Sequence, residues 1–187
     1  MATNNQLNLG LSGSTGTGNF VGANTPTLIT PVLGVSTATS INFGVDALGN
    51  YTKTTSWTPV LTFATPGNLS VVYTNQVGEY VRIGNQVTVS ALVACTPTFT
   101  TASGNLNFTG LPFAQSSNTG SGGVFNINSV TPVYPTGTTF TTAKVSGSTT
   151  TILVIGNGTG VANSNLNTTH FVSGNAVNFL FTVTYNV

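Results

Sequence analysis

Charged side chains are nearly absent from this sequence. Only 3% of its 187 residues are Asp, Glu, Lys or Arg, whereas roughly 25% is usual for a soluble domain. The charged residues are Asp46, Lys53, Glu79, Arg82 and Lys144, and the formal net charge is +1. Binding to phosphate groups needs clustered Lys and Arg, and three scattered cations form no cluster. We therefore expect no nucleic-acid partner.

The scarcity of titratable groups also restricts the chemistry that the chain can perform. Acid–base catalysis needs such groups placed together, and the two carboxylates, Asp46 and Glu79, lie in different parts of the chain. A Ser-His-Asp triad would need the single histidine, His170, beside Asp46, and no Gly-x-Ser-x-Gly elbow frames a serine. The sequence predicts a protein that is not an enzyme and has no catalytic residues.

A single cysteine, Cys95, excludes an intrachain disulfide framework. Two apolar residues precede it, which predicts a buried and inert thiol. One His, one Cys and two carboxylates are too few for a closed zinc site, so we expect no metal and no cofactor. A trimer could gather three copies of His170 on its axis, although the flanking Thr169 and Phe171 give no His-x-His motif.

Long apolar runs are missing as well. The first ten residues lack the basic region and the apolar stretch of a signal peptide, and no run approaches the roughly 18 apolar residues of a membrane helix. We expect synthesis in a cytosol without export, and no insertion into a membrane.

The residues that are present favour strands and turns. Hydrophobic residues make up 39% of the chain, with 11 Phe and 5 Tyr, which is more than a disordered chain would have. Thr suits a pleated sheet, while Asn, Ser and Gly suit turns. A surface without charge lacks the usual protection against edge-to-edge association. We therefore expect an all-β fold whose surface is partly buried in a homo-oligomer, with solvation by hydroxyl and amide groups as the alternative.

Residues 1–55 differ from the rest of the chain. They hold a Gly/Ser/Thr-rich run at residues 10–18 and a Pro-punctuated segment at residues 25–34, and Pro26 and Pro31 keep the preceding residues extended. The apolar groups are too few for a core. We interpret this segment as an extended attachment and oligomerisation arm that orders against partner chains, with an unstructured tail as the alternative.

Residues 56–187 have the pattern of a globular β domain. The C-terminal segment alternates strictly, with apolar residues at 177, 179, 181, 183, 185 and 187 and Leu180 as the one apolar exception between them. The segment from Gly78 to Cys95 contains a similar alternation from Val87 onward. Gly84-Asn85 suggests a two-residue hairpin turn. That loop would put Arg82 opposite Val87 on the core face, so hydrophobic matching predicts an odd-length loop or a bulge instead.

Further strands are expected over 60–63, 69–74, 105–108, 123–130, 139–145 and 150–155, separated by turn-rich segments. Several short strands with frequent turns are typical of a sandwich. The predicted architecture is an extended arm followed by an antiparallel β-sandwich that resembles a jelly roll.

Two aromatic residues are candidates for binding a sugar. Trp57 and Tyr134 lie beside Thr/Pro-rich segments and could stack on a sugar face. For Trp57 we favour a structural role at the base of the β domain. For Tyr134 both readings stay open, so it is a weak candidate for a glycan contact.

Three segments resemble phage tail-fibre and virion structural proteins. They are the stretch from Asn8 to Phe43, the run Trp-Thr-Pro-Val-Leu-Thr-Phe at 57–63, and Gly-Glu-Tyr-Val-Arg-Ile-Gly-Asn-Gln-Val-Thr-Val at 78–89 followed by Gly-Leu-Pro-Phe at 110–113. The resemblance implies a homotrimer with an N-terminal attachment segment and a distal β domain. It supplies no catalytic motif.

The function predicted from these features is that of a bacteriophage virion protein assembled in the host cytoplasm. The leading hypothesis is a short tail fibre or receptor-binding protein, whose residues 1–55 dock on other virion proteins and whose β domain meets a host surface glycan or protein. The alternative is a head decoration protein or head fibre that binds and stabilises the capsid.

Overall fold

The computed structural model describes residues 41–43, 46–48, 52–117, 120–129 and 132–187. Their strands all pair antiparallel, which confirms the predicted all-β class. The elements are β1 Ile41–Phe43, β2 Asp46–Leu48, β3 Thr52–Trp57, β4 Val60–Thr65, β5 Ser70–Ile83, β6 Gln86–Thr98, β7 Ser103–Thr109, β8 Gly122–Ile127, β9 Phe140–Val145, β10 Ile152–Asn157, β11 Ser164–Asn165, a 3-10 helix Thr168–His170 and β12 Val177–Asn186. No helix within these residues is long and apolar enough to span a membrane.

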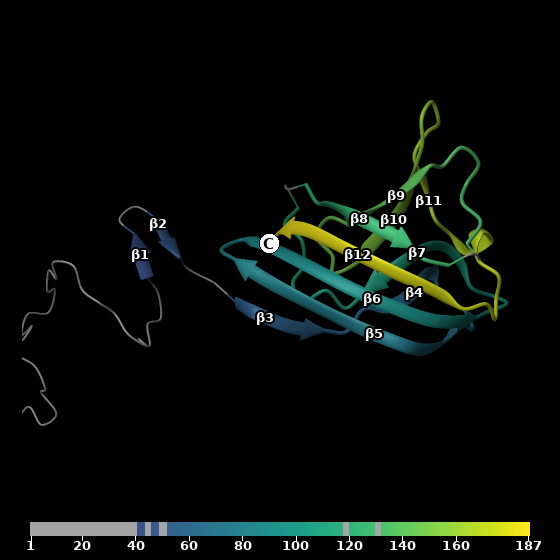
Figure 1. Cartoon of the computed structure of the whole chain (residues 1–187), viewed down its shortest axis with the longest axis horizontal. Coiled ribbons are helices and arrows are strands. Elements are labelled where there is room, and N and C mark those ends of the chain that lie inside the picture. Colours follow the sequence, from purple (N-terminus) through teal and green to yellow (C-terminus); the bar gives the residue numbers. More distant parts are fainter. Residues whose placement is uncertain (1–40, 44–45, 49–51, 118–119, 130–131) are drawn as a thin grey trace, which may run out of the picture. The chain divides into compact units, whose positions relative to one another are not determined.

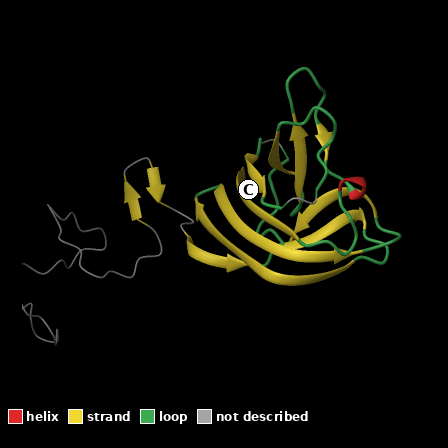
Figure 2. Cartoon of the chain, turned by 45° about the vertical axis from the view of Figure 1, so that its right-hand side comes forward, coloured by secondary structure: helices red, strands yellow, loops and turns green. Residues whose placement is uncertain are grey.

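Strands β1 and β2 pair only with each other, while the other ten strands belong to one sheet. Its order is β3-β5-β6-β12-β8-β9-β10-β7-β4, with β11 beside β10. Strands β3 and β4 are consecutive in sequence and yet form the two ends of this order. The sheet must therefore curl, and Figures 1 and 2 show the bend of its long strands β5, β6 and β12. The backbone N–H of Leu61 on the end strand β4 donates to the hydroxyl of Tyr73 at 2.9 Å, and Tyr73 lies on β5, the neighbour of the other end strand β3.

The inside of the curl is filled by phenylalanine rings. Phe108 on β7 lies 5.0 Å from Phe181 on β12 and 5.7 Å from Phe125 on β8, measured between ring centroids. Three strands separate β7 from β12 in the sheet, so this contact crosses the interior. Phe125 and Phe181 are stacked at 5.2 Å. Each such pair stabilises the fold by about 0.5–1.5 kcal/mol beyond its buried area. The two halves of one sheet thus face each other as the layers of the predicted sandwich would.

The C-terminal strand β12 agrees with the alternation of its sequence. The side chains of Val177, Phe179, Phe181, Val183 and Tyr185 are buried, while Leu180 on the opposite face is 51% exposed. This strand pairs with β6 on one side and β8 on the other. The predicted strand and its buried face are confirmed, and β12 is an inner strand of the sheet.

The prediction of an odd-length loop at Gly84-Asn85 is wrong. Ile83 pairs with Gln86 and Arg82 with Val87, so the loop has two residues and Gly84 takes a positive φ of 58°. The bulge lies elsewhere, at Thr74, between the pairs Tyr73–Cys95 and Asn75–Ala94. The strand predicted at 69–74 continues through this bulge to Ile83, so that β5 is one long strand.

Contacts far apart in the sequence decide this register. Gly78 and Tyr80 face the core, because Trp57 packs on Gly78 and Tyr80 meets the ring of Phe113. The same phase brings Arg82 to the core side, where its guanidinium lies 4.8 Å from the centroid of Phe113 and its Nε donates to the Gly84 carbonyl. Ile83 is left 52% exposed. Matching of neighbouring apolar residues could not reveal these partners.

Three further predictions concern Cys95, Trp57 and the N-terminal arm. Cys95 and Trp57 are buried, as predicted. Strand β3 begins at Thr52, which pairs with Arg82. Residues 1–40, which hold most of the arm expected over 1–55, lie outside the described residues, so the arm stays a prediction.

Candidate functional site

The segments at 57–63, 78–89 and 110–113, which carry the family resemblance, pack against one another. A Cβ atom at Gly78 would stand 2.5 Å from the indole Nε1 of Trp57, so a glycine is needed beneath this ring. The same Nε1 donates to the carbonyl of Ser90 at 3.3 Å. Gly110 has a positive φ of 93°, and the carbonyl oxygen of Thr58 lies 2.5 Å from the point that a Cβ atom on residue 110 would occupy. These residues serve the packing of the domain, and a ligand site must be sought elsewhere.

Cys95 and His170, the titratable residues singled out in the sequence, both have structural roles in the folded domain. Cys95 is 2% exposed, and burial raises the pKa of its thiol to about 11, whereas a reactive cysteine has a lowered pKa. The Nδ1 of His170 accepts a hydrogen bond from the backbone N–H of Asn167 at 3.0 Å, which closes a capping box around the 3-10 helix. Within the described parts of the chain, no three His, Cys, Asp or Glu side chains are grouped as metal ligands.

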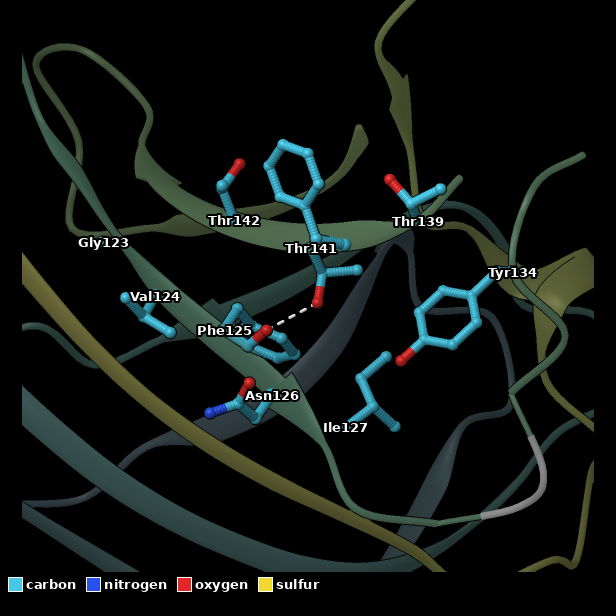
Figure 3. Close-up of a pocket in the computed structure, with 10 residues that line it drawn as sticks. Gly123, Val124, Phe125, Asn126, Ile127, Tyr134, Thr139, Thr141 and Thr142 are labelled. Carbon is cyan, nitrogen blue, oxygen red and sulfur yellow. Dashed lines mark hydrogen bonds between the residues drawn. The ribbon is translucent and has the colours of Figure 1, made fainter. Parts of the chain in front are cut away.

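A cavity of about 490 Å³ lies where strands β8 and β9 separate. Their ladder runs from Gly123–Ala143 to Phe125–Thr141, and β8 continues to Ile127 beyond the last pair. Residues 123–127, residues 139–142 and Tyr134 line the space. Figure 3 shows the Tyr134 hydroxyl pointing across the gap toward Ile127. This volume falls in the roughly 300–1,000 Å³ range of small-molecule sites.

The cavity gathers the exposed aromatic residues of the domain. Tyr134 is 41% exposed and Phe140 is 56% exposed, and both line it. Every other aromatic side chain whose burial the structure describes is buried or half-buried. Exposed rings are costly to leave in water and are enriched at binding surfaces.

Polar groups stand beside these rings. The amide of Asn126 and the hydroxyl of Tyr134 are exposed and make no hydrogen bond to another described residue. Thr142 accepts a hydrogen bond from Asn157 Nδ2 at 2.9 Å, which leaves its own hydroxyl proton for a ligand. Thr141 is already occupied, because it donates to the carbonyl of Phe125. The site therefore offers both donors and acceptors.

Among the described residues that line the cavity, none has a charged side chain. Lys144 follows Thr142 on the same face of β9 but does not line the space. Partial burial raises the pKa of Tyr134, so its phenol stays neutral and able to donate at physiological pH. An uncharged ligand fits such a site better than an ionic one.

Sequence reasoning singled out one residue of this cavity. Tyr134 lines it, and its role in glycan contact stays a prediction. Phe140, Asn126 and Thr142 were missed as site residues. Phe140 opens the alternating run 140–145, in which Thr141, Ala143 and Val145 are buried, so the period-two pattern could have placed Phe140 on the outer face.

A row of aliphatic residues crosses the outer face of the sheet. Val77 on β5 pairs with Leu92 on β6, which pairs with Leu180 on β12. Val77 and Leu180 are 52% and 51% exposed, and Val124 on the adjoining strand β8 is 63% exposed. Glu79, next to Val77 on this face, is exposed as well. We call Val77, Leu92 and Leu180 the aliphatic row.

Comparison with known proteins assigns the chain to no family. No family model matches the chain, and no curated protein matches it. Among solved structures it is similar to the Dettilon tailspike protein, with 22% sequence identity and a TM-score of 0.49. The alignment covers 71% of this chain and 23% of the tailspike chain. We therefore transfer no property of that protein.

Proposed function

We propose that the chain is a bacteriophage virion protein, acting as a short tail fibre or receptor-binding protein that presents its β domain to the host surface. One observation carries the proposal: the two exposed aromatic rings of the domain share an open, uncharged cavity. A site of this composition suits binding rather than chemistry. The resemblance of segments 57–63, 78–89 and 110–113 to phage particle proteins supports a place on the virion.

We further propose that the protein binds its receptor without modifying it. The described side chains offer Glu79 as a carboxylate, and it is exposed on the outer face of β5, outside the residues that line the cavity. Hydrolysis of a glycosidic bond ordinarily uses two carboxyl groups flanking that bond. The expected result is that incubation with host surface glycan releases no reducing ends. Release by the wild-type chain would contradict this part of the proposal.

Association into a homotrimer is the second part of the proposal. Val77 and Leu180 of the aliphatic row are exposed and Leu92 is half-buried between them, and we take a second copy of the chain as the occupant of this face. With Glu79 as its one charged neighbour on β5, this face can pack on another copy with little like-charge repulsion, and apolar contact would remove exposed Val and Leu from water.

The third part concerns docking through residues 1–55. Because Thr52 already pairs with Arg82 in the sheet, a clean test deletes residues 1–50 rather than the whole segment. The deleted chain is expected to unfold at the same temperature as the full chain and to be missing from purified particles. Normal incorporation of the deleted chain would contradict the docking role.

Competition for host cells tests the receptor-binding role. Purified full-length protein is expected to inhibit adsorption of the phage that encodes it. Binding of the protein to purified empty heads, with no inhibition of adsorption, would instead favour the head decoration alternative.

A further inference from the structure

We propose that the cavity between β8, β9 and Tyr134 binds one uncharged pyranose ring of a surface glycan. The proposal deepens the receptor-binding function and rests on it for the source of the glycan. The binding chemistry itself rests on the cavity alone.

The two rings supply the apolar contact. A pyranose presents C–H groups on its faces and hydroxyl groups around its rim, so it combines an apolar side with a polar edge. The electron-rich face of an aromatic ring attracts such polarised C–H groups. Tyr134 and Phe140 retain 41% and 56% of their exposure, so a ligand can reach their surfaces. The other aromatic side chains whose burial the structure describes are buried or half-buried.

The polar groups match the rim of the sugar. A hydroxyl group both donates and accepts, and it is best met by side chains that do the same or that pair a donor with an acceptor. Asn126 offers a carbonyl and an NH₂ group, Tyr134 offers a phenol, and Thr142 retains a free hydroxyl proton. Figure 3 shows the Tyr134 hydroxyl pointing into the space between the strands.

The absence of charge in the lining selects among sugars. The lining residues include neither Lys, Arg nor His to neutralise a carboxylate, and neither Asp nor Glu to accept from an ammonium group. Burying an unpaired ion is costly. Neutral hexoses and their N-acetyl derivatives therefore fit, and uronic acids do not.

The test uses the full-length protein and single sugars, without phage or cells. The probes are the methyl glycosides of glucose, galactose, mannose, N-acetylglucosamine and rhamnose, with methyl glucuronide as the charged counterpart, observed by saturation-transfer NMR. At least one neutral glycoside is expected to bind saturably with the millimolar affinity of a small ligand. The glucuronide is expected to bind at least about fivefold more weakly.

Variants locate the binding. Tyr134→Ala and Phe140→Ala are each expected to weaken binding by about tenfold, and Tyr134→Phe by no more than about threefold because the ring is kept. Val133→Ala is the matched control, because Val133 is 68% exposed beside Tyr134 and does not line the cavity. Unchanged thermal unfolding of each variant shows that the domain is intact.

Three results would overturn the proposal: no neutral glycoside binds, the glucuronide binds as well as the neutral sugars, or binding survives Tyr134→Ala and Phe140→Ala together. If no glycoside binds and Tyr134→Ala changes the oligomeric mass, the cavity is an interface between copies. Because sugar binding is measured on the isolated protein, it can succeed where adsorption competition fails. Failure of the sugar-binding proposal can therefore be distinguished from failure of the receptor-binding proposal.

Discussion

The indole of Trp57 covers Gly78 on the neighbouring strand so closely that a methyl group at residue 78 would stand 2.5 Å from Nε1. Trp57 is 7% exposed and also contacts Phe181 in the core, so the ring has little room to withdraw. This contact fixes the register of β5 on β3 and, through it, the face on which every later residue of β5 lies.

Replacing Gly78 with Ala is therefore expected to destabilise the domain. Overpacking of this kind costs about 1–3 kcal/mol in the free energy of unfolding, which urea denaturation measures. Gly122→Ala is the control, because a Cβ there meets nothing within 4 Å and the backbone has no positive φ. It is expected to leave the free energy unchanged or slightly raised. Equal effects of the two substitutions would contradict the role of Trp57.

Strands with a strict alternation of apolar and polar residues could be predicted from the sequence. The alternation of β12 and of Val87–Cys95 on β6 predicted both the strands and their buried faces, because one face of each meets the core. The register of the hairpin between β5 and β6 was missed, since it depends on Trp57 and on Phe113, which is 31 residues beyond Arg82. A pattern of neighbouring residues in the sequence cannot predict a contact over this separation.

The candidate site was predictable only in part for a similar reason. Tyr134 stood out by its Pro-rich surroundings, and composition alone predicted a surface rich in Thr and Asn. The separation of β8 from β9 after Phe125 and Thr141 creates the cavity, and this separation is a property of the folded sheet. Phe140 looks like a core residue in the sequence until the phase of β9 is known.

Arg82 is expected to stabilise the domain through its stacking on Phe113. Its guanidinium carbon lies 4.8 Å from the ring centroid and Nε donates to Gly84 at 2.7 Å. Arg82→Met should lower the free energy of unfolding by about 1 kcal/mol. The control Lys144→Met, at an exposed site on β9, should change it little. An unchanged free energy of unfolding in Arg82→Met would show that the stacking on Phe113 does not stabilise the domain.

Alkaline pH is expected to destabilise the protein. Burial raises the pKa of Cys95 from 9.0 to about 11 and the pKa of Tyr185 from 10.0 to about 12. Above pH 9 the unfolded chain loses these protons while the folded chain keeps them, so stability present below pH 9 falls as pH rises toward 12. The Cys95 contribution is on the order of 2 kcal/mol.

Urea denaturation between pH 8 and pH 11 measures this effect. Cys95→Ala should flatten the decline between pH 9 and pH 11, even though the space left by the lost sulfur atom lowers stability at every pH. A free energy of unfolding that stays level through this range in the wild type would show that neither group is held protonated by the fold.

The aliphatic row predicts how the oligomer can be broken. Leu180→Lys places a charge at the β12 end of this row, and we expect light scattering to report the mass of a monomer with the same thermal unfolding of the domain. Val172→Lys is the control, at a residue that is 54% exposed outside the strands. If both variants keep the oligomeric mass of the wild type, the copies associate through another surface.

The central claim is that the β domain attaches the phage to its host through the cavity at Tyr134. The most direct measurement is inhibition of phage adsorption by saturating purified protein, comparing the wild-type chain with its Tyr134→Ala and Val133→Ala variants. We expect the wild type and Val133→Ala to inhibit adsorption and Tyr134→Ala to lose most of this inhibition. Adsorption unaffected by the wild-type protein, or inhibited equally by all three, would contradict it.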